Sequence, residues 1–266
     1  MSDLSSRVAL ITGGTSGIGL ATARAFANHG SSVVIAARNE QRGKRVEHEL
    51  SADTGASIRF VKADMGRGED IQRLVRDTVR HFGRIDYAFN NAVHLDYTIA
   101  PTHELTEDEF DRTYRVNQKG VWLCMKYQIQ QMLSQTPRGG AIVNASSVNG
   151  LGATPMGAFY SATKAAVLAL TKAAALEYAQ SGIRINALVP GPVRTPSLED
   201  SFDRIGAETG RTAEEVEKET RNRNPSGRLG SPEELAEVVV WLCSSSATYV
   251  VGHSMIVDGG ETAFVR

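Results

Sequence analysis

The sequence predicts an α/β protein whose core is a doubly wound, seven-stranded parallel sheet with helices on both faces. Two observations predict it, namely the two kinds of local sequence pattern and their regular alternation. Short runs rich in β-branched residues alternate with longer segments of helical periodicity, and the alternation continues along the whole chain. Parallel neighbours need crossover connections, which are right-handed and cover both faces of the sheet. Ligands of such a sheet bind at the carboxyl ends of its strands.

The elements follow one another in order along the chain. The expected strands are 8–12, 32–36, 58–62, 85–89, 141–144, 184–188 and 255–257. The expected crossover helices are 18–29, 41–50, 70–82, 110–133, 159–180 and 233–244. One segment, 197–224, interrupts the alternation because it is rich in charged residues and flanked by prolines. We expect a poor core former that makes a helical substrate lid at about 195–226, with a solvated surface insertion as the alternative.

The composition is that of one globular domain spanning residues 1–266. With 41% hydrophobic and 22% charged residues, a chain of this length buries a large core. The formal net charge of -1 argues against a nucleic-acid partner. Residues 1–7 form no apolar signal core, and no run of about eighteen apolar residues predicts a membrane segment. We therefore expect a cytoplasmic protein that acts on small molecules.

The two cysteines, Cys124 and Cys243, lie within apolar helical patterns. A buried thiol in such a pattern acts mainly as a small hydrophobic group, so both cysteines are predicted to be structural. Few, structural cysteines are typical of a cytoplasmic protein. We also expect no metal site.

A serine, a tyrosine and a lysine form the pattern that points to redox chemistry on a carbonyl. Tyr160 and Lys164 stand one turn apart on an expected helix, and Ser147 precedes Tyr160 by thirteen residues. A free phenol has a pKa of about 10. A neighbouring ammonium lowers that pKa, which makes Tyr160 a usable general acid or base. Ser147 can then hold the substrate oxygen.

A glycine-rich turn after the first expected strand predicts a dinucleotide site. Gly13, Gly17 and Gly19 follow Thr12 with the spacing G-x-x-x-G-x-G, and a helix begins near Ile18. Glycine lets the backbone approach a pyrophosphate, while the helix N-terminus supplies amide donors and a positive dipole end. A tight turn alone also favours glycine, but the strand before it and the helix after it favour the phosphate site.

Residues after the second and third strands indicate which nicotinamide cofactor binds. An acidic residue at the end of the second strand would accept from a ribose 2′-hydroxyl, whereas this chain has Ala37 and Arg38. A guanidinium matches a 2′-phosphate, so we predict NADP(H) in preference to NAD(H). In the alternative, Arg38 stacks on the adenine and either cofactor is accepted. Asp64 accepts from the adenine amine or, alternatively, caps a helix near Met65.

These motifs together resemble a classical short-chain dehydrogenase/reductase, from about residue 7 to residue 260. The motifs that agree in order and spacing are the turn 12–19, Asp64, Asn90-Asn91-Ala92, Asn117, the Ser147/Tyr160/Lys164 set and the segment 190–195. The resemblance implies a Rossmann-like fold, an NAD(P)-dependent reaction between a carbonyl group and an alcohol, and a homotetramer. It also implies that residues of the turn 12–19 and of the segment 190–195 contact the cofactor.

The resemblance implies a role for each of four catalytic residues. Tyr160 would be the general acid or base, Lys164 would lower its pKa and hold the nicotinamide ribose, and Ser147 would bind the substrate oxygen. Asn117 would support a proton-relay water. We choose Ser147 over Ser146 because it keeps the thirteen-residue spacing to Tyr160. The expected cofactor-binding residues are Gly13, Thr15, Ser16, Gly17, Ile18, Gly19, Arg38, Asp64, Met65, Asn90, Ala92, Tyr160, Lys164, Pro190, Gly191, Val193 and Thr195.

One position departs from the family pattern. Where the family continues Asn-Asn-Ala with glycine, this chain has Val93. Valine is costly if the position has a positive φ or lies against the cofactor, so we expect a displaced loop and a reshaped pocket. His94 follows, and it either lines the cleft as a second titratable group or is incidental there.

The expected substrate pocket is moderately apolar with few hydrogen-bonding groups. Its residues are Ser147, Asn149, His94 and Phe159, with Val93, Met156 and Pro190 as neighbours. This mixture suits a small carbonyl compound or secondary alcohol that exchanges a hydride with NADP(H). The alternatives are a 3-oxoacyl-(acyl-carrier-protein) reductase, a dehydratase or epimerase that uses the nicotinamide transiently, and an NADP-binding regulatory protein without turnover.

Overall fold

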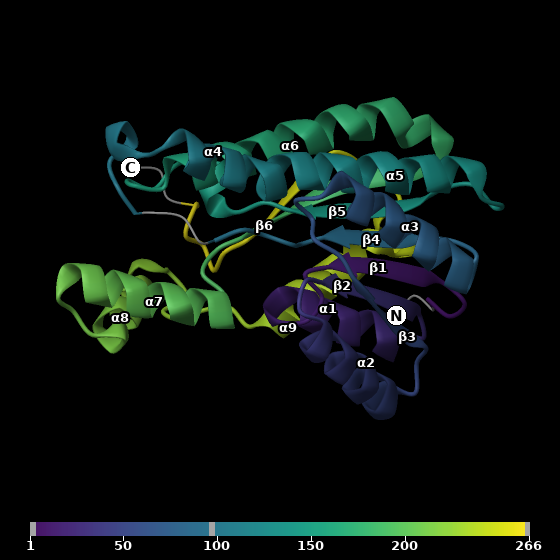
Figure 1. The fold of residues 1–266 in the computed structure, drawn as a ribbon, viewed down its shortest axis with the longest axis horizontal. Coiled ribbons are helices and arrows are strands. Elements are labelled where there is room, and N and C mark those ends of the chain that lie inside the picture. Colours follow the sequence, from purple (N-terminus) through teal and green to yellow (C-terminus); the bar gives the residue numbers. More distant parts are fainter. Residues whose placement is uncertain (1–3, 96–98, 264–266) are drawn as a thin grey trace.

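The computed structural model describes residues 4–95 and 99–263, and its centre is the predicted parallel sheet (Figure 1). In this part of the chain seven strands lie in the order β3-β2-β1-β4-β5-β6-β7, each parallel to its neighbours. The strands are β1 (Val8–Thr12), β2 (Ser32–Ala37), β3 (Ile58–Lys62), β4 (Tyr87–Asn90), β5 (Gly140–Ala145), β6 (Ile183–Pro190) and β7 (Ser254–Val257). The order reverses between β1 and β4, so ligands are expected at the carboxyl ends of these strands.

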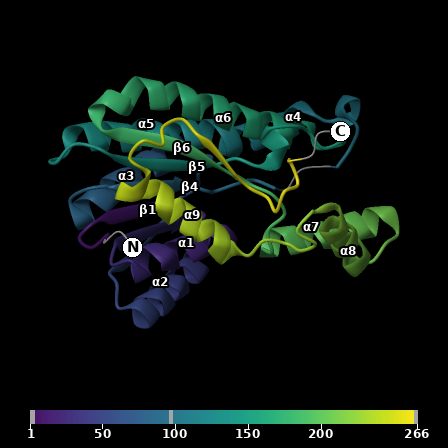
Figure 2. The same cartoon turned by 180° about the vertical axis from the view of Figure 1, so that it is seen from behind.

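Helices cover both faces of the sheet, as Figures 1 and 2 show from opposite sides. One face carries α1 (Gly17–Asn28), α2 (Glu40–Thr54) and α9 (Pro232–Cys243). The other carries α3 (Gly68–Phe82), α5 (Val121–Ser134) and α6 (Ala158–Tyr178). α4 (Glu107–Tyr114) precedes α5, whereas α7 (Pro196–Thr209) and α8 (Ala213–Arg223) project beyond the sheet. The doubly wound prediction is confirmed.

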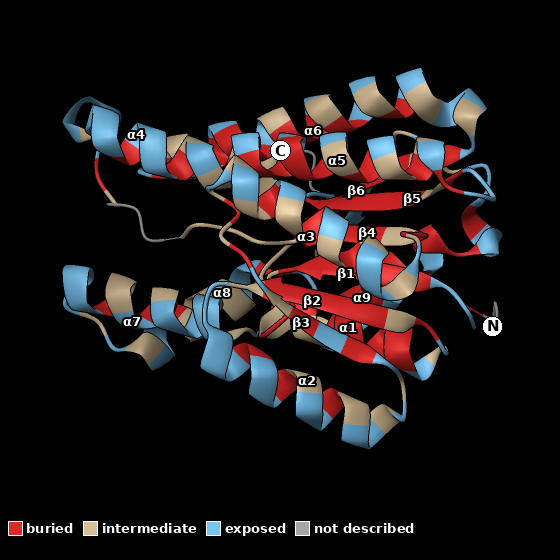
Figure 3. Ribbon diagram, turned by 45° about the vertical axis from the view of Figure 1, so that its right-hand side comes forward, coloured by how far each residue is buried: buried red, intermediate tan, exposed pale blue. Residues whose placement is uncertain are grey.

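The centre of the sheet is buried because the side chains of its inner strands alternate between two apolar cores. In β1, Ile11 packs in the core under α1 and α9, while its neighbour Leu10 packs in the core under α3 and α5. Phe26 of α1 fills the first core and Met132 of α5 fills the second. Figure 3 shows the strands as buried and the outer helix faces as exposed. Burial on both faces explains why these strands read as continuous apolar runs.

The predicted helix 110–133 is confirmed as one continuous helical stretch, in which α4 and α5 are joined by a π-helical turn over Arg115–Gly120. A π-helical turn shifts the hydrogen-bonding pattern by one residue while the chain stays helical, so apolar periodicity does not reveal it. Asn117 lies in this turn and is fully buried. The strand expected at 85–89 also begins later, at Tyr87.

The charged segment after β6 is helical, as expected, and contributes only Phe202 and Val216 as buried hydrophobic residues. It folds into α7 and α8, whose apolar sides enclose a small separate core of Phe202, Val216 and Leu229. Its charged residues pair at the surface, for example Arg211 with Glu219. Two connecting segments that join in a single bridge, Val193 with Gly230, attach this pair of helices to the sheet. We call residues 195–226 the lid, after the segment that the sequence predicts as a substrate lid.

Both cysteines are buried and unpaired, as expected. Burial raises the pKa of Cys124 and of Cys243 to about 12, so neither thiol ionises readily near neutral pH. Among the helices of residues 4–95 and 99–263, none has the length and apolar character needed to span a lipid bilayer.

Candidate active site

Tyr160 and Lys164 lie on the first turns of α6, at the edge of the sheet where the strands end. The Lys164 ammonium lies 5.6 Å from the centroid of the Tyr160 ring and donates a hydrogen bond of 2.8 Å to the carbonyl oxygen of Ala145. Lys164 is only 3% exposed. This burial lowers its pKa from 10.5 to about 8. The amine therefore stays mostly charged at pH 7, close to the phenol that it would activate.

Two adjacent serines follow β5, and their side chains have different surroundings. Ser146 is buried, and its hydroxyl donates to the backbone carbonyl of Lys164 at 2.8 Å. Ser147 is half-buried, and its oxygen accepts the backbone N–H of Asn149 at 3.2 Å. The Ser146 hydroxyl is thus used to hold α6, whereas the Ser147 hydroxyl keeps its proton for a bound oxygen.

Asn117 links the π-helical turn to the loop after β4. Its carboxamide oxygen accepts the backbone N–H of His94 at 2.7 Å, and its amide donates to the backbone carbonyl of His94 at 3.0 Å. The Nε2 atom of His94 is buried and has no hydrogen-bond partner in the described part of the chain. The Asn117 side chain therefore fixes the course of this loop, a role that the sequence did not indicate.

The glycine turn leaves the start of α1 open to an anion. Ser16 precedes the helix, but its side chain makes no capping hydrogen bond, and no acidic residue lies in the first turn. Amide groups at an uncapped helix start are ready donors to a phosphate. Gly17 has a φ of 51°, and a Cβ there would lie 3.0 Å from the Thr195 methyl group. The residues of this turn fit a nicotinamide dinucleotide.

Gly19 is where the turn packs most tightly, so its substitution is informative. A Cβ at Gly19 would lie 2.2 Å from the carbonyl oxygen of Gly13 and 2.7 Å from the amide nitrogen of Asn91. We expect Gly19→Ala to displace the turn and to weaken NADPH binding by about tenfold or more in fluorescence titration, because the phosphate donors move. Gly68→Ala is the control, since its Cβ would make ordinary contact with Leu123. Equal binding by the two variants would contradict this role.

The segment after β4 is tied to the glycine turn by a second set of hydrogen bonds. The backbone N–H groups of Asn91 and Ala92 both donate to the Thr12 hydroxyl, at 3.0 and 3.1 Å. Asn90 faces inward instead, where its side chain bonds to Gln128 and Asn144 in a buried polar network. The Asn90 side chain is therefore used within the protein, and its backbone is the part left for a contact with the cofactor.

Val93 does not have the positive φ at which valine in place of the family glycine would be costly. Among the described residues, the only non-glycine residues with positive φ are Ser6 and Met156. Val93 is half-buried and has an ordinary conformation. Valine is therefore compatible with the course of this loop, and its side chain adds bulk beside the site.

The residues expected at the adenosine end lie at the carboxyl ends of β2 and β3. Arg38 directly follows β2 and is exposed. Asp64 accepts the backbone N–H of Gly66 at 2.8 Å, so one of its oxygens stabilises a turn. Its other oxygen remains for an adenine amine. Met65 is buried and contributes packing.

The segment after β6 is far from the glycine turn in the sequence but lies beside it in the structure, where Thr195 faces Gly17. Gly191 donates its backbone N–H to Val257, and Val193 is buried. Pro190 ends β6 itself. Thr195 accepts the N–H of Leu198 and so caps α7, the first helix of the lid.

Two expected pocket residues have contacts that the sequence did not predict. The Phe159 ring packs edge-on against Phe110 of α4, with 5.4 Å between ring centroids. Asn149 accepts a hydrogen bond of 2.8 Å from the Thr154 hydroxyl. Phe159 therefore supports the packing of α6 on α4, while Asn149 is oriented by a neighbouring loop.

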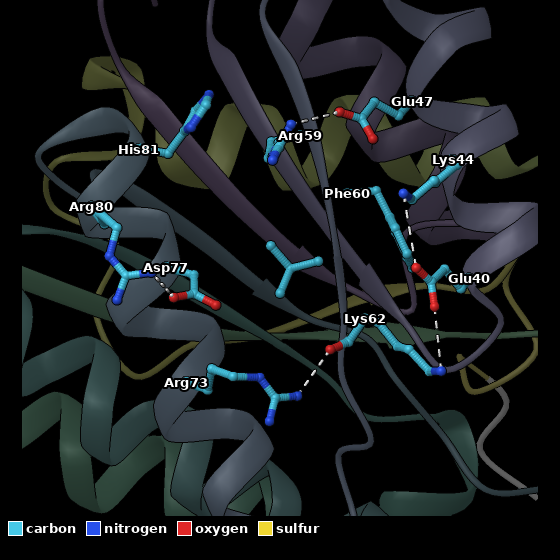
Figure 4. Close-up of a pocket in the computed structure, with 11 residues that line it drawn as sticks. Glu40, Lys44, Glu47, Arg59, Phe60, Lys62, Arg73, Asp77, Arg80 and His81 are labelled. Carbon is cyan, nitrogen blue, oxygen red and sulfur yellow. Dashed lines mark hydrogen bonds and ion pairs between the residues drawn. The ribbon is translucent and has the colours of Figure 1, made fainter.

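A hollow along the edge strand β3 lies apart from these residues (Figure 4). Its charged side chains come from α2, β3 and α3, and they are paired with one another: Lys44 and Lys62 with Glu40, and Arg59 with Glu47. Neither the catalytic set nor the glycine turn contributes to it. We therefore assign the chemistry to the carboxyl ends of the strands and not to this hollow.

Comparison with known proteins identifies the family. A family model described as "Enoyl-(Acyl carrier protein) reductase" matches residues 13–262. The chain is 42% identical to an A-factor type gamma-butyrolactone 1'-reductase (1S-forming) of Streptomyces virginiae, over 97% of this chain and 96% of that protein. It is 39% identical to a 2,5-dichloro-2,5-cyclohexadiene-1,4-diol dehydrogenase of Sphingobium indicum, over 99% and 100%. The crystal structure of levodione reductase matches with a TM-score of 0.92 and 34% identity, over 98% and 99% of the two chains. The chain therefore belongs to the short-chain dehydrogenase/reductase family, whose members are NAD(P)(H)-dependent oxidoreductases of alcohols and carbonyl compounds.

Proposed function

We propose that this chain is an NADP(H)-dependent dehydrogenase/reductase that interconverts a secondary alcohol and a ketone on a small carbon ring. The observation that carries the proposal is a buried, still charged Lys164 one turn from Tyr160. A charged amine in a buried position costs free energy, and it is retained where it tunes a neighbouring group. A protein that only bound the cofactor would have no need of a phenol tuned in this way.

During reduction, the catalytic residues Tyr160, Ser147 and Lys164 act at the carbonyl oxygen of the substrate. Tyr160 donates its phenolic proton to the carbonyl oxygen, and the Ser147 hydroxyl donates a hydrogen bond to the same atom. Lys164 stabilises the phenolate that remains on Tyr160. The nicotinamide, when bound, supplies the hydride or accepts it in the reverse direction. In the oxidation Tyr160 takes the proton back from the alcohol.

The names of relatives support a cyclic substrate. One is a dehydrogenase of a cyclohexadiene-1,4-diol, at 39% identity over nearly the whole chain. We expect reduction of cyclohexanone or 1,4-cyclohexanedione, followed as loss of NADPH absorbance, and slower reduction of a 3-oxoacyl thioester. Tight NADPH binding without turnover of any of these compounds would instead favour a regulatory protein.

The preference for NADP(H) is tested at Arg38. We expect Arg38→Asp to lower kcat/KM for NADPH by about tenfold or more, because a charge-assisted bond to the 2′-phosphate is lost. The same change is expected to raise kcat/KM for NADH, since a carboxylate accepts from a 2′-hydroxyl. Arg80→Ser, which removes an exposed arginine of α3, is the control. An unchanged cofactor ratio would assign Arg38 to stacking on the adenine.

The proposal includes a cytoplasmic homotetramer. Trp122 of α5 is 44% exposed and Leu176 of α6 is 82% exposed, on helices that cover one face of the sheet. Ile256 is exposed on β7, an edge strand of the sheet. Apolar side chains and open strand edges of this kind favour pairing with further copies. Light scattering is expected to give a mass four times that of the chain.

A further inference from the structure

We propose that Asn149 recognises a second oxygen atom of the substrate, placed on the ring away from the carbon that reacts. The inference rests on the proposed function, because it concerns the same pocket. It narrows the substrate class from a cyclic ketone or alcohol to a ring that carries two oxygens, such as a dione, a hydroxyketone or a diol.

Asn149 is held directly beside the serine that would bind the reacting oxygen. Ser147 precedes a 3-10 turn, Val148–Gly150, and its hydroxyl oxygen accepts the N–H of Asn149 at 3.2 Å. The turn is closed by a hydrogen bond of 2.8 Å from the N–H of Gly150 to the Ser147 carbonyl. The Asn149 carboxamide branches from the carbon next to that bonded nitrogen. The carboxamide therefore lies on the same short turn as the Ser147 hydroxyl.

The Asn149 side chain is also oriented. An asparagine amide has one acceptor oxygen and two N–H donors at its opposite end. The Thr154 hydroxyl donates to the oxygen at 2.8 Å, which leaves the Nδ2 group as the end available to a ligand. Within residues 4–95 and 99–263, this Nδ2 group donates no hydrogen bond to another protein atom. The carboxamide is thus set as a hydrogen-bond donor.

The loop that supplies Thr154 has a strained conformation. Its residue Met156 has a φ of 63° although it is not glycine, and its side chain is 50% exposed. A hydrogen bond of 3.0 Å from the N–H of Gly157 to the carbonyl of Thr154 closes this turn, and Gly157 directly precedes α6. Strained residues persist where their surroundings hold them, and they gather at ligand sites. Thr154 is therefore held between the Ser147 turn and the helix of Tyr160.

Two donors consequently lie on one short turn: the Ser147 hydroxyl and the Asn149 amide. A ring with one oxygen satisfies only the first donor, and a substrate that leaves a site donor unpaired is discriminated against strongly. A ring with two oxygens satisfies both. The relative named for a cyclohexadiene-1,4-diol is a dehydrogenase of such a ring.

The test compares 1,4-cyclohexanedione with cyclohexanone in the intact protein. Asn149→Leu keeps the volume of the side chain and removes the donor. We expect the loss of kcat/KM for the dione to exceed the loss for cyclohexanone by about tenfold or more, chiefly through KM. Asn28→Leu, an exposed asparagine in the last turn of α1, is the matched control.

Thr154 gives a second, independent arm, because it acts through Asn149. Thr154→Val removes the hydroxyl and is expected to lower kcat/KM for the dione several-fold, whereas Thr154→Ser restores it. Calorimetric titration of 1,4-cyclohexanediol into protein saturated with NADPH measures recognition without turnover. We expect Asn149→Leu to weaken this binding by about tenfold.

The outcomes separate the inference from the function on which it rests. Equal losses for the two ketones, or no loss for either, together with unchanged binding of the diol, would overturn the role of Asn149 and leave the enzyme activity intact. Failure of the wild-type protein to reduce either ketone with NADPH or NADH would overturn the proposed function. In that case the titration of the diol still decides whether Asn149 binds a second oxygen.

Discussion

Tyr160→Phe is expected to lower kcat for ketone reduction by about 100-fold to 10,000-fold, the range over which a positioned general acid contributes. The phenylalanine ring fills the same space, so the fold and the cofactor site are retained. The substitution removes the phenolic hydroxyl, and with it the proton that the substrate oxygen needs. Steady-state rates with NADPH and cyclohexanone measure the loss, and fluorescence titration of NADPH is expected to give the same affinity as in the wild-type protein.

Tyr178→Phe is the matched control for this substitution, because it removes a phenol from the last turn of the same helix. It is expected to leave kcat within about twofold of the wild-type value, since surface changes away from the site have small effects. A Tyr160→Phe enzyme that keeps its rate would show that another group protonates the substrate. His94, whose buried Nε2 atom has no hydrogen-bond partner among the residues that the structure describes, would then be the first candidate.

Lys164→Met is expected to lower kcat by about 100-fold, because the phenol of Tyr160 loses the positive charge that favours its ionisation. The two residues act as a unit, so their effects should not add. We expect the double variant Tyr160→Phe with Lys164→Met to be no slower than Tyr160→Phe alone. Lys172→Met, at an exposed position on the same helix, is the control. Additive losses would show that the lysine acts independently of the tyrosine.

The same lysine makes a separate prediction for stability. Burial lowers the pKa of Lys164 from 10.5 to about 8 in the folded protein. Above pH 10.5 the amine is neutral in both the folded and the unfolded state. As the pH falls towards 8, the unfolded chain takes up a proton that the folded chain does not, and the folded state loses stability. Below pH 8 the full loss is present, about 3 kcal/mol for a shift of this size.

Denaturant unfolding of wild-type protein and Lys164→Met at several pH values measures this effect. The free energy of unfolding of the wild-type protein, relative to the variant, is expected to rise by about 3 kcal/mol between pH 8 and pH 10.5. In the methionine variant the Ala145 carbonyl loses its hydrogen bond from the Lys164 amine. This loss changes the free energy of unfolding of the variant by an amount that does not depend on pH. A difference that stays flat with pH would show that Lys164 titrates normally in the folded state.

The sequence by itself determined the architecture, because the information lies in local patterns. Ile11 and Leu10 show the alternation that sends neighbouring side chains to opposite cores, and this alternation repeats in the central strands of the sheet. Tyr160 and Lys164 are one helical turn apart, so their proximity follows from helix geometry alone. The glycine turn is likewise local, since the strand and the helix that flank it are its immediate neighbours.

Other features of the site depend on contacts between segments far apart in the chain, and only the tertiary structure decided them. Ser146 and Ser147 are alike in sequence, and they differ because the Lys164 backbone takes the hydroxyl of the first. The Asn117 carboxamide is used by the backbone of His94, in a π-helical turn that apolar periodicity does not reveal. Composition predicted a poor core former at 195–226, and it could not show the small apolar cluster of Phe202, which forms only when two amphipathic helices meet. Spacing along the chain therefore predicts which groups are present, whereas packing decides which of their hydrogen-bonding atoms remain free to meet a substrate.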